Sequence, residues 1–177
     1  KEYRRQRQMC IRDSTYTLTD GTATDTATLT ITVSGKNDTP AGVDDTDSVN
    51  EDATVTKTGS EDDVLNDDTD ADTDASLTVT NISHTNGNSG SVSSGSTYNS
   101  SGTQIVGTYG TLTIGANGSY TYTADQTAAD DLDANDPATD VFTYTLTDEN
   151  SATATATLTI TITCLLYTSP SPRDLST

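Results

Sequence analysis

The sequence predicts an all-β protein, and its most natural architecture is a Greek-key-like β-sandwich of about seven strands. Several segments alternate apolar residues with Thr, and this period of two places one set of side chains on a core face and the other in solvent. Gly, Asn and Asp residues, which favour turns, separate these segments. No stretch shows the 3.6-residue period of an amphipathic helix. Short strands separated by turns are typical of a sandwich.

The clearest strands lie near the end of the sequence. Phe142, Tyr144 and Leu146 alternate with Thr, and residues 154–162 repeat the pattern with Ala, Leu and Ile. Thr suits the outward positions because its branched side chain fits the pleated sheet while its hydroxyl stays hydrated. Both segments are therefore predicted to be strands with one buried face.

Earlier elements follow from weaker patterns. Residues 112–114 and 120–122 are predicted to form a hairpin across Gly-Ala-Asn-Gly (115–118), because an Asn-Gly pair supplies the positive φ angles of a tight turn. Residues 77–82 are predicted to be a strand, and residues 49–55 to be the first strand of the domain. Residues 83–103, rich in Ser, Gly and Asn, are interpreted as a long insertion or flexible loop without strands.

The two ends of the sequence differ chemically from the rest. Residues 1–14 hold five of the eight basic residues, the single Met and one of the two Cys residues, and Cys164 opens the other end. RRQRQMCIRDS (4–14) and CLLYTSPSPRD (164–174) resemble in-frame translations of the two arms of a common transposon-based sequencing adaptor. Residues 1–14 and 164–177 are therefore expected to be adaptor-derived and the chain to be a fragment of a longer protein. The alternative is a basic arm with a redox-active cysteine pair.

An internal repeat divides the remaining sequence. TYTLTDGTATDTATLTITV (15–33) recurs 128 residues later as TYTLTDENSATATATLTITI (143–162), with one added residue. This period is the length of a domain, which favours beads on a string over a stacked solenoid. The predicted layout is the last hairpin of a preceding repeat (15–33), a linker (34–46) and one complete repeat (47–163). Two strands alone are marginal, so residues 15–33 are expected to be poorly ordered or opportunistically paired.

Residues 15–163 are strongly acidic. They contain 24 acidic side chains, 21 of them Asp, against two lysines, Lys36 and Lys57. Such a surface repels nucleic acid and anionic membranes and attracts divalent cations. Leu, Ile, Val and Phe supply only 24 of these 149 residues, which is low for a charged chain that must fold. Because no disulfide is expected to compensate, bound metal is the expected stabiliser.

Two acidic loops are expected to meet at one pole of the domain. If the first strand and the last two strands run between two poles, residues 59–76 and 124–140 both lie at the C-terminal pole. The carboxylates there repel one another without a cation, and calcium accepts six to eight oxygens in irregular geometry. The sequence therefore predicts a calcium site between these loops; the alternative is a solvated acidic loop that binds nothing specifically. The candidate ligands are Asp67, Asp68, Asp70, Asp72, Asp74 and Asp140.

Four blocks of sequence carry a family resemblance. They read SGKNDTPAGVDDTDSVNED (34–52), DVLNDDTDAD (63–72), YGTLTIGANGSYTYTAD (109–125) and DVFTYTLTDENSATATATLTITI (140–162). Together and in this order they resemble VCBS repeats, which are cadherin-like modules of giant bacterial surface and RTX-type adhesins. The resemblance implies a cadherin/Ig-like sandwich, calcium (Ca2+) binding, type I secretion to the extracellular space or cell surface, and a role in adhesion or biofilm formation.

The resemblance also implies particular ligands. Residues 37–40 resemble the Asn-Asp-x-Pro part of cadherin-type linkers, although Lys36 stands where such linkers often carry an acidic or small residue. No RTX nonapeptide repeat occurs in the sequence. The implied ligands are Asn37 and Asp38 in the linker, Glu51 and Asp52 at the N-terminal pole, the Asp-x-Asp pair Asp70 and Asp72, and Asp148 in the last turn at the N-terminal pole.

The sequence is compatible with three functions, of which the first is expected. It is a calcium-stiffened spacer whose partners are neighbouring repeats of the same chain, with surface glycans or other cells as further partners. The second is a glycan-binding module, but residues 15–163 contain no Trp and only Tyr98 and Tyr109 fall outside the predicted core. The third is a hydrolase with paired carboxylates, for which abundant Asp is not a site, and His84 is interpreted as an ordinary surface residue. We therefore expect no enzyme activity, no nucleic-acid partner and no membrane insertion.

Overall fold

A computed structural model of the chain describes residues 10–59, 62–72, 75–133 and 137–164. The chain divides into two compact units, Lys1–Asp38 and Thr39–Thr177, and each is considered by itself. Among the described residues, no helix is both long enough and apolar enough to cross a membrane.

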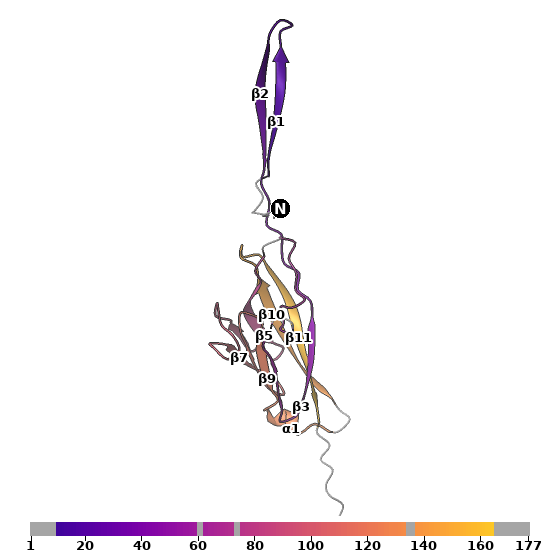
Figure 1. Cartoon of the computed structure of the whole chain (residues 1–177). Coiled ribbons are helices and arrows are strands. Elements are labelled where there is room, and N and C mark those ends of the chain that lie inside the picture. Colours follow the sequence, from indigo (N-terminus) through magenta and orange to yellow (C-terminus); the bar gives the residue numbers. More distant parts are fainter. Residues whose placement is uncertain (1–9, 60–61, 73–74, 134–136, 165–177) are drawn as a thin grey trace, which may run out of the picture. The chain divides into compact units, whose positions relative to one another are not determined.

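The first unit is a two-stranded hairpin of β1 (Cys10–Thr19) and β2 (Thr24–Val33) (Figure 1). The ladder runs without interruption from the pair Cys10 and Val33 to the pair Thr19 and Thr24. β1 begins five residues before the repeated segment, inside residues 1–14, because residues 29–33 of β2 offer five further ladder positions. Large apolar side chains such as Tyr16 remain 50% exposed. The described side chains of this unit therefore form no core, in keeping with two strands that pair only with each other.

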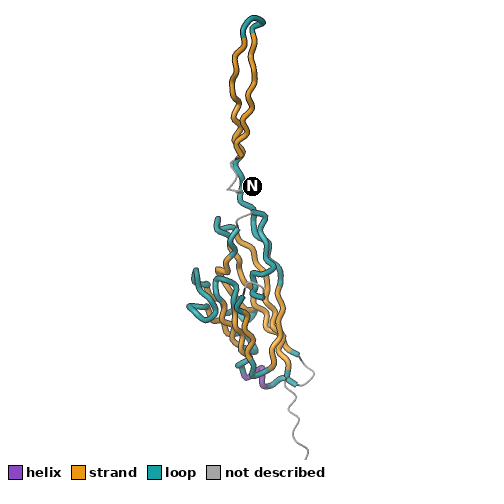
Figure 2. Tube along the Cα trace, in the orientation of Figure 1, coloured by secondary structure: helices purple, strands orange, loops and turns teal. Residues whose placement is uncertain are grey.

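The second unit is a sandwich of two sheets (Figures 1 and 2). One sheet has the order β3–β11–β10–β5–β6 and the other β4–β9–β8–β7. Neighbouring strands are antiparallel except β3, which runs parallel to β11. The elements are β3 (Asp45–Asn50), β4 (Thr54–Lys57), β5 (Thr78–His84), β6 (Ser89–Ser91), β7 (Thr103–Val106), β8 (Thr111–Ile114), β9 (Tyr120–Thr123), α1 (Thr127–Asp130), β10 (Ala138–Thr147) and β11 (Thr153–Thr163). The predicted all-β sandwich is confirmed, and its described residues form two strands more than the seven expected.

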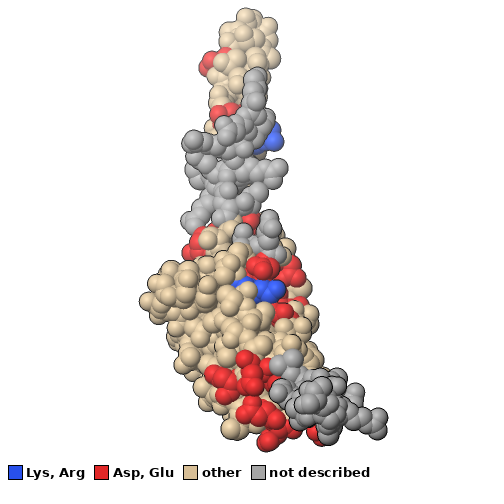
Figure 3. Space-filling model, turned by 60° about the horizontal axis from the view of Figure 1, so that its bottom comes forward, with Lys and Arg blue, Asp and Glu red and all other residues tan. Residues whose placement is uncertain are grey.

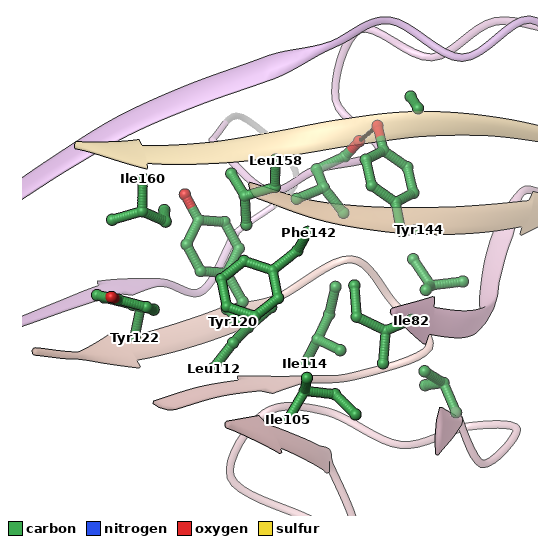
Figure 4. Packing of buried hydrophobic residues seen from close by; sticks show 14 of the residues in the cluster. Ile82, Ile105, Leu112, Ile114, Tyr120, Tyr122, Phe142, Tyr144, Leu158 and Ile160 are labelled. Carbon is green, nitrogen blue, oxygen red and sulfur yellow. Dashed lines mark hydrogen bonds between the residues drawn. The ribbon is translucent and has the colours of Figure 1, made fainter. Parts of the chain in front are cut away.

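The core lies between the inner faces of the two sheets (Figure 4). Phe142, Tyr144 and Leu146 are each fully buried, while the Thr residues between them are partly exposed. Leu158 and Ile160 of β11 are buried in the same way. Each fully buried side chain of this kind contributes about 1.5–3 kcal/mol. The alternation with Thr thus predicted both strands and their buried faces correctly.

The predicted hairpin at 112–122 is present as β8 and β9, but with a different turn. Ile114 pairs with Tyr120 and Leu112 pairs with Tyr122. Gly118 has a φ of 84°, and its N–H donates to the Gly115 carbonyl at 3.1 Å. Gly115 N–H donates to Ser119 O at 2.9 Å. This is a three-residue loop in which a glycine of positive φ follows a type I turn, so only the Gly of the Asn-Gly pair adopts positive φ.

The predicted first strand, residues 49–55, is wrong, because it is two strands in different sheets. β3 ends at Asn50 and β4 begins at Thr54. Between them, Asp52 adopts the left-handed region with a φ of 59°, and Ala53 N–H donates to Asn50 O at 3.1 Å. The alternation wrongly indicates one continuous strand because Val49 in β3 and Val55 in β4 both occupy odd-numbered positions on either side of the turn. β4 therefore runs back toward the end where β3 begins, and the acidic loop after β4 lies at the opposite end from the one expected.

Residues 83–103 are also more structured than predicted. β5 continues to His84, β6 adds an edge strand, and Val92 is 7% exposed. The Nδ2 groups of Asn86 and Asn88 donate to Val106 O at 3.0 and 2.7 Å. These bonds tie the β5–β6 turn to the end of β7 in the opposite sheet. The Asn side chains here hydrogen-bond to a backbone carbonyl at the end of β7. The Ser-, Gly- and Asn-rich composition gives no sign of this order.

Asp140 is fully buried on β10 and is held by five donors. Its Oδ2 accepts hydrogen bonds from the Tyr122 hydroxyl at 2.7 Å and from Tyr109 N–H and Gly110 N–H at 3.1 and 3.2 Å. Its Oδ1 accepts from Thr108 N–H at 2.9 Å and from His84 Nε2 at 3.1 Å. Both oxygens are therefore occupied by protein donors. Asp140, expected as a calcium ligand, instead fixes the β7–β8 loop to the core.

His84 is buried with only 6% of its surface exposed, so its interpretation as a surface residue is wrong. Its Nδ1 accepts a hydrogen bond from Asn86 N–H at 3.1 Å, which leaves the ring proton on Nε2, facing Asp140. The β7–β8 loop approaches so closely that a methyl group on Gly107 would collide with Asp140 Oδ2. Gly107 is thus required by the loop that Asp140 holds.

We predict that Asp140→Asn destabilises the sandwich by about 3 kcal/mol, since a buried charge-assisted network loses an acceptor and gains unmatched N–H donors. The free energy of unfolding in urea measures the effect. Asp131→Asn removes the same charge from an exposed position and is the matched control, with an expected change within about 0.5 kcal/mol. Equal effects of the two substitutions would contradict the role given to Asp140.

Candidate functional site: two acidic ends

The sandwich has two ends that the chain itself defines. The entry end holds residues 41–45 and the β10–β11 turn, because Gly42 lies against Leu146 and Ala156 near that turn. The exit end holds Thr163, where β11 ends, together with the β3–β4 turn, whose Glu51 N–H donates to Thr163 O at 2.9 Å. α1 follows β9 at this exit end (Figure 1).

The two acidic loops lie at opposite ends, so the prediction that they meet at one pole is wrong. β4 leaves the exit end, since its first residue, Thr54, pairs with Thr123, the last of β9. The following loop reaches the entry end, where Ser76 N–H donates to Glu149 Oε2 at 3.1 Å. The loop after β9 stays at the exit end. The split of the first strand into two is the physical reason for this reversal.

Oxygen atoms gather around the Tyr144 hydroxyl at the entry end. Within 3.3 Å of this hydroxyl lie the carbonyl oxygens of Val64 and Val43, at 2.8 and 3.1 Å. The carboxylates of Asp45 and Asp68 complete the group, with Asp45 Oδ2 at 3.0 Å and the two Asp68 oxygens at 3.2 and 3.3 Å. One phenol supplies a single proton. This cluster is therefore rich in oxygen and poor in hydrogen-bond donors.

The electrostatics of the cluster favour an added positive charge. Burial raises the pKa of Asp45 to about 7; the Tyr144 hydrogen bond opposes the rise, and the neighbouring carboxylates Asp67, Asp68 and Asp63 add to it. Burial likewise raises the pKa of Asp63 and of Asp68. Val43 N–H donates to Asp68 Oδ1 at 2.7 Å and offsets part of this cost. A proton or a cation would relieve the remaining repulsion.

Asp70 lies close in sequence to this cluster and has an unsatisfied oxygen. Its Oδ1 accepts a hydrogen bond from Asp72 N–H at 2.7 Å, whereas its Oδ2 is buried and has no hydrogen-bond partner. Thr69, between Asp68 and Asp70, pairs through its backbone with Ala41, with N–H to O distances of 2.8 and 3.0 Å. The loop is thus pinned to the incoming chain beside a carboxylate oxygen that no described donor satisfies.

Asp148 also lies at the entry end, where it closes the β10–β11 turn. Its Oδ1 accepts hydrogen bonds from Asn150 N–H and Ala152 N–H, both at 2.8 Å. Asp20 does the same in the β1–β2 turn, where hydrogen bonds from Ala23 and Thr22 lower its pKa to about 2. Because Asp20 and Asp148 occupy equivalent repeat positions, turn closure accounts for an Asp at both.

Acidic side chains of the exit end come from two loops. Glu51 and Asp52, expected at the N-terminal pole, lie here instead, because Asp52 N–H donates to Ala124 O at 3.2 Å. In Figure 3, which brings this end forward, acidic atoms form a patch on the surface. Asp125, Asp130, Asp131 and Asp133 belong to the segment around α1 and are exposed. The sandwich therefore carries carboxylates at both ends.

The other predicted calcium ligands and the two candidate glycan-binding tyrosines lie in several different parts of the chain. Asn37 and Asp38 belong to the first unit, where Asn37 Nδ2 donates to Asp38 O at 2.7 Å. Asp67 is exposed and Asp72 is half-buried at the entry end, and Asp74 lies outside the described residues. Within the described ranges, no three His, Cys, Asp or Glu side chains form a ready metal-binding group. Tyr98 and Tyr109 are both partly buried, Tyr109 against the core.

Sequence reasoning missed Asp45 and Tyr144 as parts of the entry-end cluster. Tyr144 is in the core as predicted, but the alternation indicates only that the ring is buried and not what its hydroxyl contacts. Asp45 precedes the alternating residues of β3, so a carboxylate on the inward parity of a strand was the available signal. Asp63 accepts from Leu65 N–H at 3.1 Å, a local turn contact typical of Asp.

The fold and its acidic ends define a β-sandwich module. A family model of the bacterial cadherin-like domain matches residues 37–164, and the chain belongs to that family. The cadherin-like part of the resemblance is therefore confirmed.

Among solved structures, the chain is similar to a nucleoside hydrolase-related hypothetical protein from Saccharophagus degradans that is associated with carbohydrate metabolism. The identity is 18%, the TM-score is 0.39, and the similarity covers 73% of this chain and 26% of that one. The chain thus spans about a quarter of the length of that protein. A comparison with curated proteins found no match.

We predict that the metal-free sandwich loses stability as the pH rises from about 5 to about 8. The folded pKa of Asp45, about 7, lies above that of an unfolded Asp, about 3.9. Stability from this bound proton is therefore present below about pH 4 and lost as the pH rises through about 7. Urea midpoints in the presence of a chelator measure the slope.

Asp45→Asn should flatten this slope, because a neutral amide needs no proton. The exposed Asp25→Asn should leave the slope unchanged and controls for the loss of charge. A midpoint that rises between pH 5 and pH 8 in the unsubstituted chain would overturn the assignment.

Proposed function

We propose that this chain is a calcium-stiffened structural repeat of a secreted or cell-surface bacterial adhesin, a spacer and not an enzyme. The observation that carries the proposal is the presence of carboxylates at both ends of one sandwich. In a tandem array, the exit end of one repeat faces the entry end of the next, so the carboxylates of the two ends lie close together. Such a junction is repulsive unless cations bind there. Divalent cations would thus convert a flexible string of modules into a rod.

The residues at the entry end suit calcium by their chemistry. Calcium prefers carboxylate and carbonyl oxygens in irregular geometry, and the entry end offers both kinds. Among the described side chains, Asp70 Oδ2 is buried without a hydrogen-bond partner, so a cation would satisfy an oxygen that the protein leaves unpaired. The proposed ligands are Asp67, Asp68, Asp70 and Asp72 at the entry end, Glu51 and Asp52 at the exit end, and Asn37 and Asp38 in the linker.

Asp140 and Asp148 are left out of the proposed ligand set. Both oxygens of Asp140 accept hydrogen bonds from protein donors, and Asp148 closes a turn through Oδ1. Bound calcium would supply positive charge that the sandwich otherwise lacks, since residues 39–163 contain a single Lys or Arg, Lys57.

The finer role rests on the resemblance to VCBS repeats. It supports export by a type I route, an extracellular or cell-surface location, and a part in adhesion or biofilm formation. The neighbouring repeats of the same chain are the proposed partners. Affinities of about 10⁻⁴ to 10⁻³ M suffice for calcium sites outside the cell.

We predict that calcium raises the melting temperature of the chain and that Asp70→Ala removes much of this rise. A site at about a hundred times its dissociation constant adds roughly 2.7 kcal/mol. Differential scanning calorimetry with calcium, magnesium and chelator measures the shift. Asp25→Ala, an exposed Asp of the first unit, is the control and should keep the full calcium response.

The spacer role has its own test in small-angle scattering from two tandem copies of residues 34–163. Calcium should increase the maximum dimension, because the junction stiffens. If the maximum dimension is the same with calcium and with chelator, the spacer proposal fails even where calcium stabilises each module.

A further inference from the structure

We propose that the β1–β2 hairpin is a closing hairpin, and that its partner is an open sandwich of this chain's own repeat, made of strands equivalent to β3–β9. Such a sandwich lacks its last two strands, which β1 and β2 would supply. The inference does not depend on calcium.

The two hairpins of the chain share one register. Tyr16 pairs with Ala27 as Tyr144 pairs with Ala156, and Ser14 pairs with Leu29 as Phe142 pairs with Leu158. The equivalence extends along the ladder, from Cys10 and Val33, which match Ala138 and Ile162, to Leu18 and Asp25, which match Leu146 and Ala154. β1–β2 therefore presents its side chains in the same order and on the same face as β10–β11.

The same apolar side chains are exposed in one hairpin and buried in the other. Tyr16, Leu29 and Ile31 are 50%, 52% and 51% exposed. Their equivalents Tyr144, Leu158 and Ile160 are fully buried, because the opposite sheet covers them (Figure 4). β3 and β5 also pair with the outer edges of β11 and β10. The β10–β11 hairpin thus shows what covers this face and both of its edges.

The area of the face argues against a second hairpin as the partner. Ten residues at about 3.3 Å each and two strands each about 4.8 Å wide give a face of roughly 320 Å². Two such faces packed together bury roughly 640 Å², below the roughly 1,200 Å² of a stable specific interface. A partner that also pairs with the two strand edges buries more and satisfies the edge N–H and C=O groups. An open sandwich offers both.

Three inward positions of the hairpin depart from the β10–β11 pattern. Ser14 stands where Phe142 fills the core, and Arg12 stands where Asp140 accepts five hydrogen bonds. A guanidinium at this position has only N–H donors, so it could not accept the hydrogen bonds that Asp140 accepts. Asp25 stands at the end of the face, where Ala154 packs against the core. These three residues should weaken closure without abolishing it, since the six matching apolar positions from Tyr16 to Val33 remain.

The test extends the chain by one open sandwich. A second copy of residues 39–137 replaces residues 1–9, so that residue 137 joins Cys10 just as it joins Ala138. Amide hydrogen exchange is followed by mass spectrometry for residues 15–19 and 24–33. We expect exchange at least about tenfold slower than in the original chain, and slower again with Arg12→Asp and Ser14→Phe. Because closure does not use calcium, the protection should appear in chelator as well.

Leu29→Asp in the extended chain should abolish the protection, whereas in the original chain, where Leu29 is half exposed, it should change little. An extended chain whose added copy is followed by residues 138–163 is the positive control for folding of the added copy. Protection in that control but not with β1–β2 would overturn the proposal. A concentration-dependent dimer of the original chain that Leu29→Asp disrupts would overturn it too, in favour of hairpin-to-hairpin pairing.

Discussion

The β10–β11 ladder is the interaction on which the rest of the sandwich depends. β3 joins one edge of the ladder and β5 joins the other. Its inner face contributes Phe142, Tyr144 and Leu146 to the core. Asp140 and Tyr144, four residues apart on the same strand face, then fix two separate loops: Asp140 holds the β7–β8 loop, and the Tyr144 hydroxyl contacts the carbonyls of Val43 and Val64. One hairpin thus organises both sheets and both ends.

The carboxylates that contact side chains of this strand face, or belong to it, differ in the number of donors around them. Asp140 has five donors for two oxygens, so its charge is satisfied by the protein alone. Asp45 and Asp68 share the Tyr144 hydroxyl and the N–H of Val43 among four oxygens. Burial of a charge is costly unless hydrogen bonds compensate. A proton or a cation would therefore offset this cost at the entry-end cluster, whereas Asp140 requires neither; the abundance of Asp in the sequence does not distinguish the two sites.

Most of the fold could be predicted because Thr marks the outward positions of the strands. The strands of residues 142–147 and 154–162 and the β8–β9 hairpin follow from local patterns alone. The first strand could not be separated into β3 and β4, since Val49, Ala53 and Val55 keep one parity through a turn that positive φ at Asp52 creates. That single turn reverses the direction of β4. The position of every acidic loop was inferred from strand direction, so the assignment of Glu51, Asp52 and residues 67–72 to particular poles failed with it.

Contacts between residues far apart in the sequence also could not be predicted at the candidate site. The five donors of Asp140 come from β5, β9 and the β7–β8 loop, and no local pattern reports such a convergence. His84 looked like a surface residue because Ser, Gly and Asn surround it in sequence, yet its ring lies 4.8 Å from that of Phe142, a pairing across strands. The turn-closing role of Asp148 is clear from a comparison of the β10–β11 turn with the β1–β2 turn, where Asp20 makes equivalent contacts.

The two copies of the hairpin separate what local sequence determines from what tertiary partners determine. β1–β2 and β10–β11 have the same register, and both close their turns with an Asp whose Oδ1 accepts backbone N–H groups. These features persist whether or not a second sheet is present, so they arise from the strands and the turn themselves. Burial differs completely between the copies, because it depends on partners that only β10–β11 has. The alternation with Thr therefore predicts which face of a strand is apolar. Whether that face is buried depends on the strands that surround each copy of the hairpin.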